Sequence, residues 1–142
     1  MRSASLLRTL NALTLATRDM GASCAFYEKL GLIRTFDSPG FVTFSVEAPV
    51  TAENNQLHIN LELNEDFAAA SGRSLGWGRA VFFVDDVDAV HASLEASGFH
   101  APPPKDAPWG ERHFHVLDPM GHELSFATPD YSHPRWSRGG DV

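Results

Sequence analysis

LTLATRDMGASCAFYEKLGL (residues 13–32) and AVFFVDDVDAVHASLEASGF (residues 80–99) are two versions of one pattern. In each, an extended apolar segment leads through an acidic turn into a helical pattern that ends at a glycine. Asp19 and Asp86 correspond at an offset of 67 residues. A repeat of this length, with a strand and a helix in each copy, predicts two structural modules of the same kind.

Local chemistry predicts where each helix begins and ends. Asp19 in the first stretch, and Asp85 or Asp86 in the second, have carboxylates that can accept the free amide groups of a first helical turn. Gly31 and Gly98 stand where a helix ends in a left-handed residue. We therefore expect the two helices at corresponding places in the two copies.

Three further strands are predicted after each helix. They span about residues 32–37, 41–47 and 56–63 in the first half, and about 99–101, 111–117 and 122–127 in the second. The turn sequences SPG and DPMG separate neighbouring strands. The predicted fold class is α+β, a single domain over 1–142 with one βαβββ module at about 10–63, a second at about 77–128, and a loose tail at 129–142.

Composition narrows the classes of partner. The chain has 142 residues and a formal net charge of -7, so it repels phosphate backbones and we expect no nucleic acid partner. No apolar stretch has the length of a membrane span, and Arg8 and Asn11 interrupt the apolar run near the start. The single cysteine, Cys24, is expected in the core, and a chain with one cysteine suits a reducing compartment. These features predict a cytoplasmic protein.

Three segments of the chain resemble the glyoxalase I, bleomycin-resistance and extradiol dioxygenase superfamily, also called the vicinal oxygen chelate superfamily. They are TRDMGASCAFYEKLGL, VDDVDAV and PWGERHFHVLDPMGHELSF, and the resemblance covers about residues 10–128. It implies two βαβββ modules that form a curved mixed sheet around a cleft, and usually a homodimer. The third segment is most similar to the bleomycin-resistance branch, whose members bind a ligand without chemistry. The fold alone does not determine the activity.

In the metal-dependent branches, the resemblance implies four ligand positions on the first and last strands of the modules. Here they fall at Ala12, His58, Arg79 and Ser125, where the 67-residue offset relates Ser125 to His58. Only His58 is a usual ligand, because alanine has no donor atom and a guanidinium cation does not coordinate a divalent ion. Zinc, iron or manganese normally needs about three protein ligands. We therefore expect no metal cofactor at this site.

Polar residues on two strands are candidates for a ligand-binding wall. His58 and Asn60 alternate with apolar residues, so they share one strand face, which either lines the cleft or is solvated. Arg79 begins a strand of the second module. Its guanidinium either clamps a carboxylate or phosphate of a ligand, or pairs with Glu62 or Glu123.

An imidazole pair and one tryptophan complete the candidates. His113 and His115 share one face of a strand, and together with His58 they are the alternative, relocated site for a divalent metal. Trp109 lies in a loop beside a glycine. Its indole either offers a flat surface for a planar or cationic ligand or caps the core edge or a dimer interface.

Three functions remain open from the sequence. The favoured one is a small-molecule binding protein that sequesters a natural product or xenobiotic in an aromatic-lined cleft. Its expected ligand-binding residues are His58, Asn60, Arg79, Trp109, His113, His115 and Ser125. The alternative is a lyase, isomerase or dioxygenase of the same fold that uses His58, His113 and His115 as acid, base or relocated metal ligands. The third is a partner of a metabolic enzyme without activity of its own.

Overall fold

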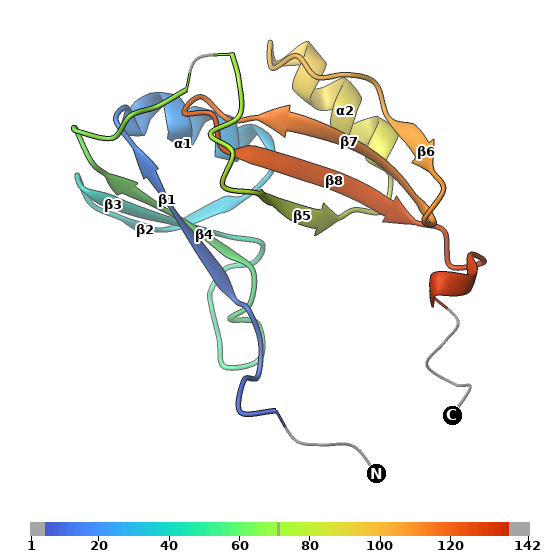
Figure 1. Ribbon diagram of the computed structural model, residues 1–142. Coiled ribbons are helices and arrows are strands. Elements are labelled where there is room, and N and C mark those ends of the chain that lie inside the picture. The colour runs from blue at the N-terminus through green and yellow to red at the C-terminus, as the bar shows by residue number, and fades with distance from the viewer. Residues whose placement is uncertain (1–4, 71, 137–142) are drawn as a thin grey trace. The chain divides into compact units, whose positions relative to one another are not determined.

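The computed structural model describes residues 5–70 and 72–136, and the chain divides into two compact units, Met1–Phe67 and Ala68–Val142. Module one consists of β1 (Ala12–Thr17), α1 (Met20–Lys29), β2 (Ile33–Asp37), β3 (Phe41–Ser45) and β4 (His58–Leu63). Module two consists of β5 (Arg79–Phe83), α2 (Val87–Ala96), β6 (Lys105–Ala107), β7 (Glu111–Leu117) and β8 (Glu123–Pro129), followed by the short helix η1 (Pro134–Trp136). The predicted α+β fold of two βαβββ modules is confirmed (Figure 1).

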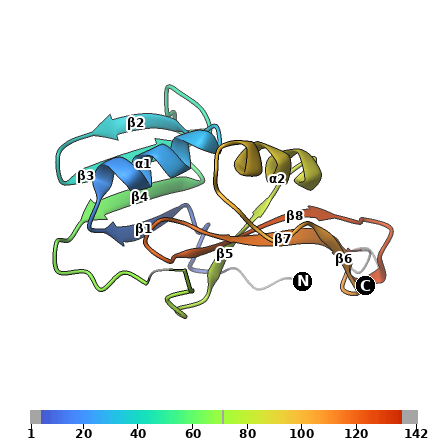
Figure 2. The ribbon, with the colours of Figure 1, turned by 90° about the horizontal axis from the view of Figure 1, so that it is seen from above.

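Each module has its own four-stranded mixed sheet. The strand orders are β1-β4-β3-β2 and β5-β8-β7-β6 (Figure 2). In both sheets the first strand pairs in parallel with the last, and the remaining pairs are antiparallel. Ala12 lies opposite His58 in one sheet, and Arg79 lies opposite Glu123 in the other. The first strand of each module therefore lies beside its last strand.

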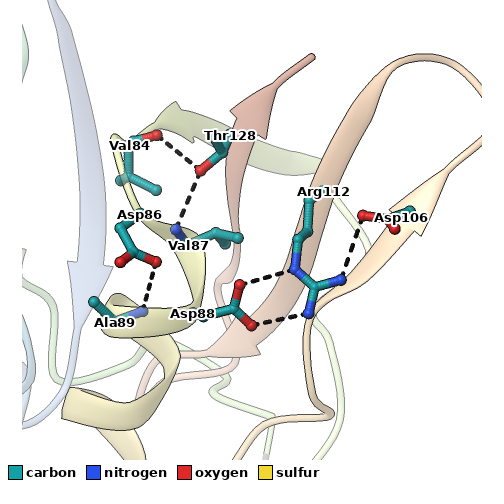
Figure 3. A network of polar contacts seen from close by, with 8 residues as sticks. All are labelled: Val84, Asp86, Val87, Asp88, Ala89, Asp106, Arg112 and Thr128. Atoms are coloured by element: carbon teal, nitrogen blue, oxygen red, sulfur yellow. Dashed lines mark hydrogen bonds and ion pairs between the residues drawn. The ribbon is translucent and has the colours of Figure 1, made fainter.

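The predicted caps start both helices. The Asp19 carboxylate accepts the amide of Ala22 at 3.0 Å, and the Asp86 carboxylate accepts that of Ala89 at 3.1 Å. Asp86, rather than the preceding aspartate, is therefore the cap of α2 (Figure 3). The two predicted C-terminal glycines have φ angles of 85° and 88°, which glycine adopts without strain. Among the described residues no helix is both long and apolar enough to cross a membrane.

Each helix covers one face of its own sheet. In module one the buried side chains include Phe26, Tyr27, Phe44, Ile59 and Leu61, and in module two Val87, Leu94, Phe114, Leu124 and Phe126. Each such side chain stabilises the fold by about 1.5–3 kcal/mol relative to an exposed one. Cys24 is buried, as expected, and burial raises the pKa of its thiol. The core thus lies between helix and sheet, which leaves the other sheet face for polar and functional residues.

One predicted strand lies elsewhere. The strand expected at 99–101 is instead β6, at 105–107. The backbone at 99–101 is bound to the last turn of α2: the amide of Phe99 donates to the Leu94 carbonyl at 2.9 Å, and that of Ala101 donates to the Glu95 carboxylate at 2.9 Å. The three prolines that follow have no N–H groups for a sheet. Pairing with β7 therefore begins only after the prolines.

The tail expected to be loose from residue 129 is attached over its described part. β8 extends to Pro129, and the side chains of His133 and Trp136 donate hydrogen bonds to carbonyls of the β6–β7 turn, at 2.8 and 2.9 Å. The reason is local chemistry, since this turn presents carbonyl oxygens that the tail's side chains can reach. Residues 137–142 lie outside the described residues.

The segment that precedes β5 is bound to the β7–β8 turn. The amide of Ala70 donates to the Met120 carbonyl at 3.1 Å, and the amide of Leu75 donates to the Gly121 carbonyl at 2.9 Å. The indole N–H of Trp77 donates to Nδ1 of His122 at 3.0 Å. The side chain of His122 therefore helps to hold this segment against the DPMG turn.

A candidate ligand-binding face on module two

The strand register identifies the residues of the sheet face away from α2. His91 of α2 packs edge-on against Phe114, so Phe114 and the residues that alternate with it face the helix. The opposite face, here called the open face, presents Arg79, Val81, Phe83, His113, His115, Leu117, Glu123, Ser125 and Ala127. Four of the predicted ligand-binding residues lie on it. Trp109 joins them from the β6–β7 turn.

Small side chains form a strip along β8 in the middle of this face. Ser125 lies between Val81 and His115 across the strands, in the register of β5, β8 and β7. Ala127, two residues further, likewise lies next to His113. Ser125 and Ala127 are 3% and 0% exposed, whereas Val81 is 52% exposed. Larger side chains therefore border this strip on both sides.

His113 and His115 are two imidazoles without hydrogen bonds among the described residues. Their ring centroids lie 5.0 Å apart, and the Trp109 ring lies 5.5 Å from that of His113 with an interplanar angle of 37°. The Nδ1 atoms of both histidines are buried and have no hydrogen-bond partner. A buried polar atom without a partner costs about 1–3 kcal/mol, so it is rare unless something binds there.

His115 is held in its neutral form by its surroundings. Burial lowers its pKa from the ordinary 6.5, and the nearby charge of Arg79 lowers it further, while Glu123 opposes the shift. A neutral imidazole has one N–H donor and one nitrogen lone pair. His115 can therefore donate to a ligand, accept from it, or accept a proton.

The guanidinium of Arg79 pairs only loosely. Its Nη1 lies 3.9 Å from Oε2 of Glu123, at the outer limit of an ion pair, and 47% of the side chain is exposed. An exposed pair at this distance contributes little to stability. Arg79 therefore keeps donors for a ligand at the end of the open face where β5 begins.

The polar residues predicted on module one are already bonded. His58 accepts or donates at both ring nitrogens, with Nδ1 2.8 Å from the Ser45 hydroxyl and Nε2 2.8 Å from the Asn55 carbonyl. Since a carbonyl only accepts, Nε2 carries hydrogen. The amide of Asn60 accepts from Thr43 at 2.7 Å and donates to a threonine of β1 at 3.1 Å. Both side chains thus hold strands of their own sheet together.

The register also corrects one correspondence between the modules. The 67-residue offset relates Val81 to Thr14, and these residues lie opposite Ser125 and Asn60. Asn60, rather than His58, is therefore the module-one equivalent of Ser125. The chain between helix and last strand is two residues shorter in module two, so the offset is 65 on the last strands.

The donor set does not fit the divalent metal that the resemblance implies. After this correction the four positions hold Ala12, Asn60, Arg79 and Ser125, which offer no carboxylate, imidazole or thiolate. Within 5–70 and 72–136, no three side chains of His, Cys, Asp or Glu gather so that they could hold a metal ion. The relocated site would also need His58, whose ring nitrogens are engaged.

A pocket of about 660 Å³ lies at the other end of β7 from Trp109. Its lining includes His100, His115, Asp118 and Glu123. It touches the open face at His115, Leu117 and Glu123 but does not include Trp109. Because the unpaired imidazoles and the indole gather at the open face, we take that face, rather than the pocket alone, as the site.

Sequence reasoning missed two apolar members of this face. Val81 and Phe83 are 52% and 53% exposed. Alternation along β5 was the signal for them, because the residues two and four positions after Arg79 must share its face. A short run of apolar residues conceals this alternation when it is interpreted as fully buried.

Comparison with solved structures shows the fold. A glyoxalase/bleomycin resistance protein/dioxygenase from Nocardioides is 23% identical, with 92% of this chain and 90% of that chain covered and a TM-score of 0.69. Lactoylglutathione lyase from Agrobacterium tumefaciens is 20% identical, covers 87% and 96%, and has a TM-score of 0.66. A bleomycin-binding protein complexed with bleomycin is 18% identical, covers 86% and 98%, and has a TM-score of 0.62. No curated protein sequence matches the chain.

The sequence model of one family covers most of the chain. The match extends over residues 9–126, from just before β1 into β8, and so includes both modules. The resemblance predicted from the three quoted segments is thereby confirmed. The chain belongs to the Glyoxalase/Bleomycin resistance protein/Dioxygenase superfamily.

Proposed function

We propose that this chain binds a small molecule on the open face of module two and holds it without a metal, as a sequestering protein of the bleomycin-resistance type. The observation that carries the proposal is the pair of buried, unpaired Nδ1 atoms of His113 and His115 beside the Trp109 ring. A similar structure is described as a bleomycin-binding protein complexed with bleomycin. A ligand that stacks on the indole and turns the imidazole rings toward itself would give these buried atoms a hydrogen-bond partner.

The other predicted residues take different parts in this proposal. Arg79 provides charge-assisted donors at one end of the face, and Ser125 forms the floor of the strip. His58 and Asn60 belong to module one, where their hydrogen bonds hold its sheet. We therefore assign those two a role in shaping that sheet face rather than in direct contact with a ligand.

The test is a binding assay with matched histidine variants. Bleomycin and a set of natural-product and heteroaromatic compounds are titrated against the wild type, His113→Ala, His115→Ala and His100→Ala. The first two variants should each weaken binding, because they remove the unpaired nitrogens. His100→Ala should not, since its side chain is 80% exposed and bonds Glu95 away from the open face. Equal loss in His100→Ala would move the ligand into the adjoining pocket.

A second candidate function is acid–base catalysis, and the lowered pKa of His115 favours it. A neutral imidazole near an arginine can take a proton from a bound substrate at neutral pH. That function would be a lyase, isomerase or related reaction of this superfamily. Mass spectrometry of each binding compound after incubation separates the candidates: a binder returns it unchanged, and an enzyme converts it at a rate that His115→Gln abolishes.

The assembly and location that go with this proposal are a homodimer in the cytoplasm. Leu6, Leu7 and Leu10 are 101%, 83% and 83% exposed, and a second copy of the chain would cover such apolar side chains. Cys24 is a buried free thiol, which suits a reducing compartment. Light scattering should give the mass of a dimer for the wild type, and replacement of the three leucines by serine should give that of a monomer.

A further inference from the structure

The C-terminal segment 130–136 is bound to the turn that carries Trp109. Three consecutive carbonyl oxygens of this turn, those of residues 108–110, accept hydrogen bonds from the segment. The donors are the side chains of His133 at 2.8 Å, Arg135 at 3.2 Å and Trp136 at 2.9 Å. Side chains of one segment thus hold three successive residues of the turn, so the segment restrains the turn's backbone.

Gly110 shows how closely the segment and the turn fit. A Cβ atom at Gly110 would lie 2.6 Å from Cγ of His133, and its φ is +88°. His133 uses both ring nitrogens, since Nε2 donates to the Pro108 carbonyl and Nδ1 accepts the amide of Arg135 at 3.1 Å. The imidazole is therefore held against the turn, and only glycine leaves room for it.

The orientation of the Trp109 indole depends on this arrangement. The backbone on both sides of Trp109 is held by the segment, and the indole N–H donates to Glu111 at 3.0 Å. With these restraints the ring lies against His113. A turn released from the segment would leave the indole with its own bond to Glu111 and its contact with the His113 ring.

Trp136 itself lies against the open face. Its ring meets the Phe83 ring edge-on at 5.7 Å and 82°, and Phe83 belongs to that face. The guanidinium of Arg135 covers one side of the Trp136 indole, 4.4 Å from its centroid. Figure 1 shows η1 beside the end of β8, on the side of the sheet away from α2. The structure thus places a second tryptophan at the same end of the strip as Trp109.

We propose that residues 130–136 complete the ligand site of module two. His133 and its neighbours are positioning residues for Trp109, and Trp136 is a second aromatic contact, so the ligand has a flat aromatic or heteroaromatic part that lies at this end of the strip. The inference rests on the proposed function for the presence of a ligand. Its positioning half concerns the free protein and is tested without one.

The positioning half is tested by ¹⁹F NMR of the free protein labelled with 5-fluorotryptophan. The chain has three tryptophans, and single Trp→Phe variants assign their signals. His133→Ala should shift and broaden the Trp109 signal and leave that of Trp77, which is bonded to His122, unchanged as a report of the fold. His133→Gln should restore the Trp109 signal, because a glutamine amide can donate to the same carbonyl. An unchanged Trp109 signal in His133→Ala overturns the positioning role.

The contact half is tested by titrating bleomycin and flat heteroaromatic fragments. Trp136→Ala should raise the Kd of a bound probe about tenfold, the loss typical of one interface aromatic. The Kd of Trp136→Phe should lie between those of Trp136→Ala and the wild type, since phenylalanine keeps a ring but loses the bond to Gly110. A Kd unchanged in Trp136→Ala, with Trp109 undisturbed, overturns the contact while the proposed function stands. Failure of every probe to bind the wild type overturns the proposed function and the contact together, and the ¹⁹F signal still decides the positioning.

Discussion

Arg112 of β7 and Asp88 of α2 form a two-bond ion pair, with Nε 2.8 Å from Oδ2 and Nη2 2.9 Å from Oδ1 (Figure 3). The third guanidinium nitrogen, Nη1, lies 3.3 Å from a carboxylate oxygen of Asp106 on β6. One arginine thus joins the first turn of α2 to β7 and to the edge strand β6. The hydrogen bonds from Arg112 hold the pKa of Asp88 below its ordinary value.

This lowered pKa predicts an acid-sensitive contribution to stability. A carboxylate with a depressed pKa in the folded state stabilises above its unfolded pKa, about 3.9, and the contribution is lost as the pH falls through the folded value. Asp88→Asn should therefore lower the free energy of unfolding at neutral pH and make it fall less steeply in acid. The effect is small and salt-sensitive because both side chains are partly exposed.

Urea unfolding at about pH 7 and about pH 3, at low and high salt, checks this expectation. Asp85→Asn is the matched control, since Asp85 is exposed and the cap of α2 is Asp86. Equal effects of the two substitutions would mean that the ion pair with Arg112 is irrelevant and only net charge counts.

The lowered pKa of His115 predicts a second pH dependence of stability, this time from a basic side chain. Its folded pKa lies below the unfolded value of about 6.5, so the unfolded chain binds the proton first as the pH falls. The contribution of His115 to stability is therefore full above about pH 6.5 and decreases down to its folded pKa. His115→Gln should flatten the stability profile in that window, and NMR titration of the ring proton should give the folded pKa directly. A midpoint at or above the ordinary value would contradict the role of burial.

Gly121 tests the attachment of the segment before β5 to the β7–β8 turn. A Cβ atom there would lie 2.9 Å from that of Ala70 and 3.0 Å from the Arg73 carbonyl, at a φ of +93°. Gly121→Ala should cost at least about 1 kcal/mol, because backbone must move and the conformation is strained. Gly40→Ala is the control, with nothing within 4 Å and an ordinary φ. Thermal melts of the two variants should therefore differ clearly, and similar melts would show that the segment is not held at the turn.

The fold was predictable because each signal in the sequence is local. A helix cap joins a carboxylate to an amide only three residues further on, so Asp19 and Asp86 mark corresponding helix starts in the two modules. The strand predicted at 99–101 was wrong, and the sequence did not indicate why. The bond that holds Ala101 to Glu95 arises from the packing of one chain segment on a helix end. Apolar content alone does not reveal such a competing partner.

The candidate site was only partly predictable for a related reason. Trp109, His113 and His115 could be grouped from strand alternation and turn chemistry. The correspondence of Ser125 with Asn60 depends on strand register. The chain between helix and last strand differs by two residues between the modules, and nothing in the strand sequences indicates this shift. The attachment of Trp136 to Gly110 joins residues 26 apart through a side chain and a carbonyl, a contact that no pattern in the sequence indicates.

Elemental analysis should find no stoichiometric zinc, iron, manganese or nickel in the purified protein. The reason is the donor chemistry at Ala12, Asn60, Arg79 and Ser125, which leaves fewer than the roughly three ligands that such ions need. Samples purified without chelator, and again after incubation with zinc followed by dialysis, provide the comparison. About one metal per chain that disappears in the double variant His113→Ala, His115→Ala would establish a metal site at the imidazole pair instead.

The last prediction concerns the separate contributions of Trp109 and Arg79 to the affinity for a ligand. Trp109 is 47% exposed and Arg79 is 47% exposed at the side chain, so neither belongs to the core and both are free to meet a ligand. Trp109→Ala should cost about 1–3 kcal/mol of binding, roughly ten- to a hundredfold in Kd, through lost stacking.

Arg79→Lys tests the polar end of the same face. If the ligand carries an anionic group there, the lysine variant should also bind more weakly, because an ammonium cannot reproduce the two-donor fork of a guanidinium. The melting temperature should barely change in Trp109→Ala, since this side chain is 47% exposed. It should barely change in Arg79→Lys either, since the pair of Arg79 with Glu123 spans 3.9 Å and contributes little. Calorimetric titration of a compound found by screening, with a thermal melt on each variant, measures both quantities. Unchanged affinity in both variants, or a large decrease in melting temperature, would show that these side chains support the fold and that the ligand binds elsewhere.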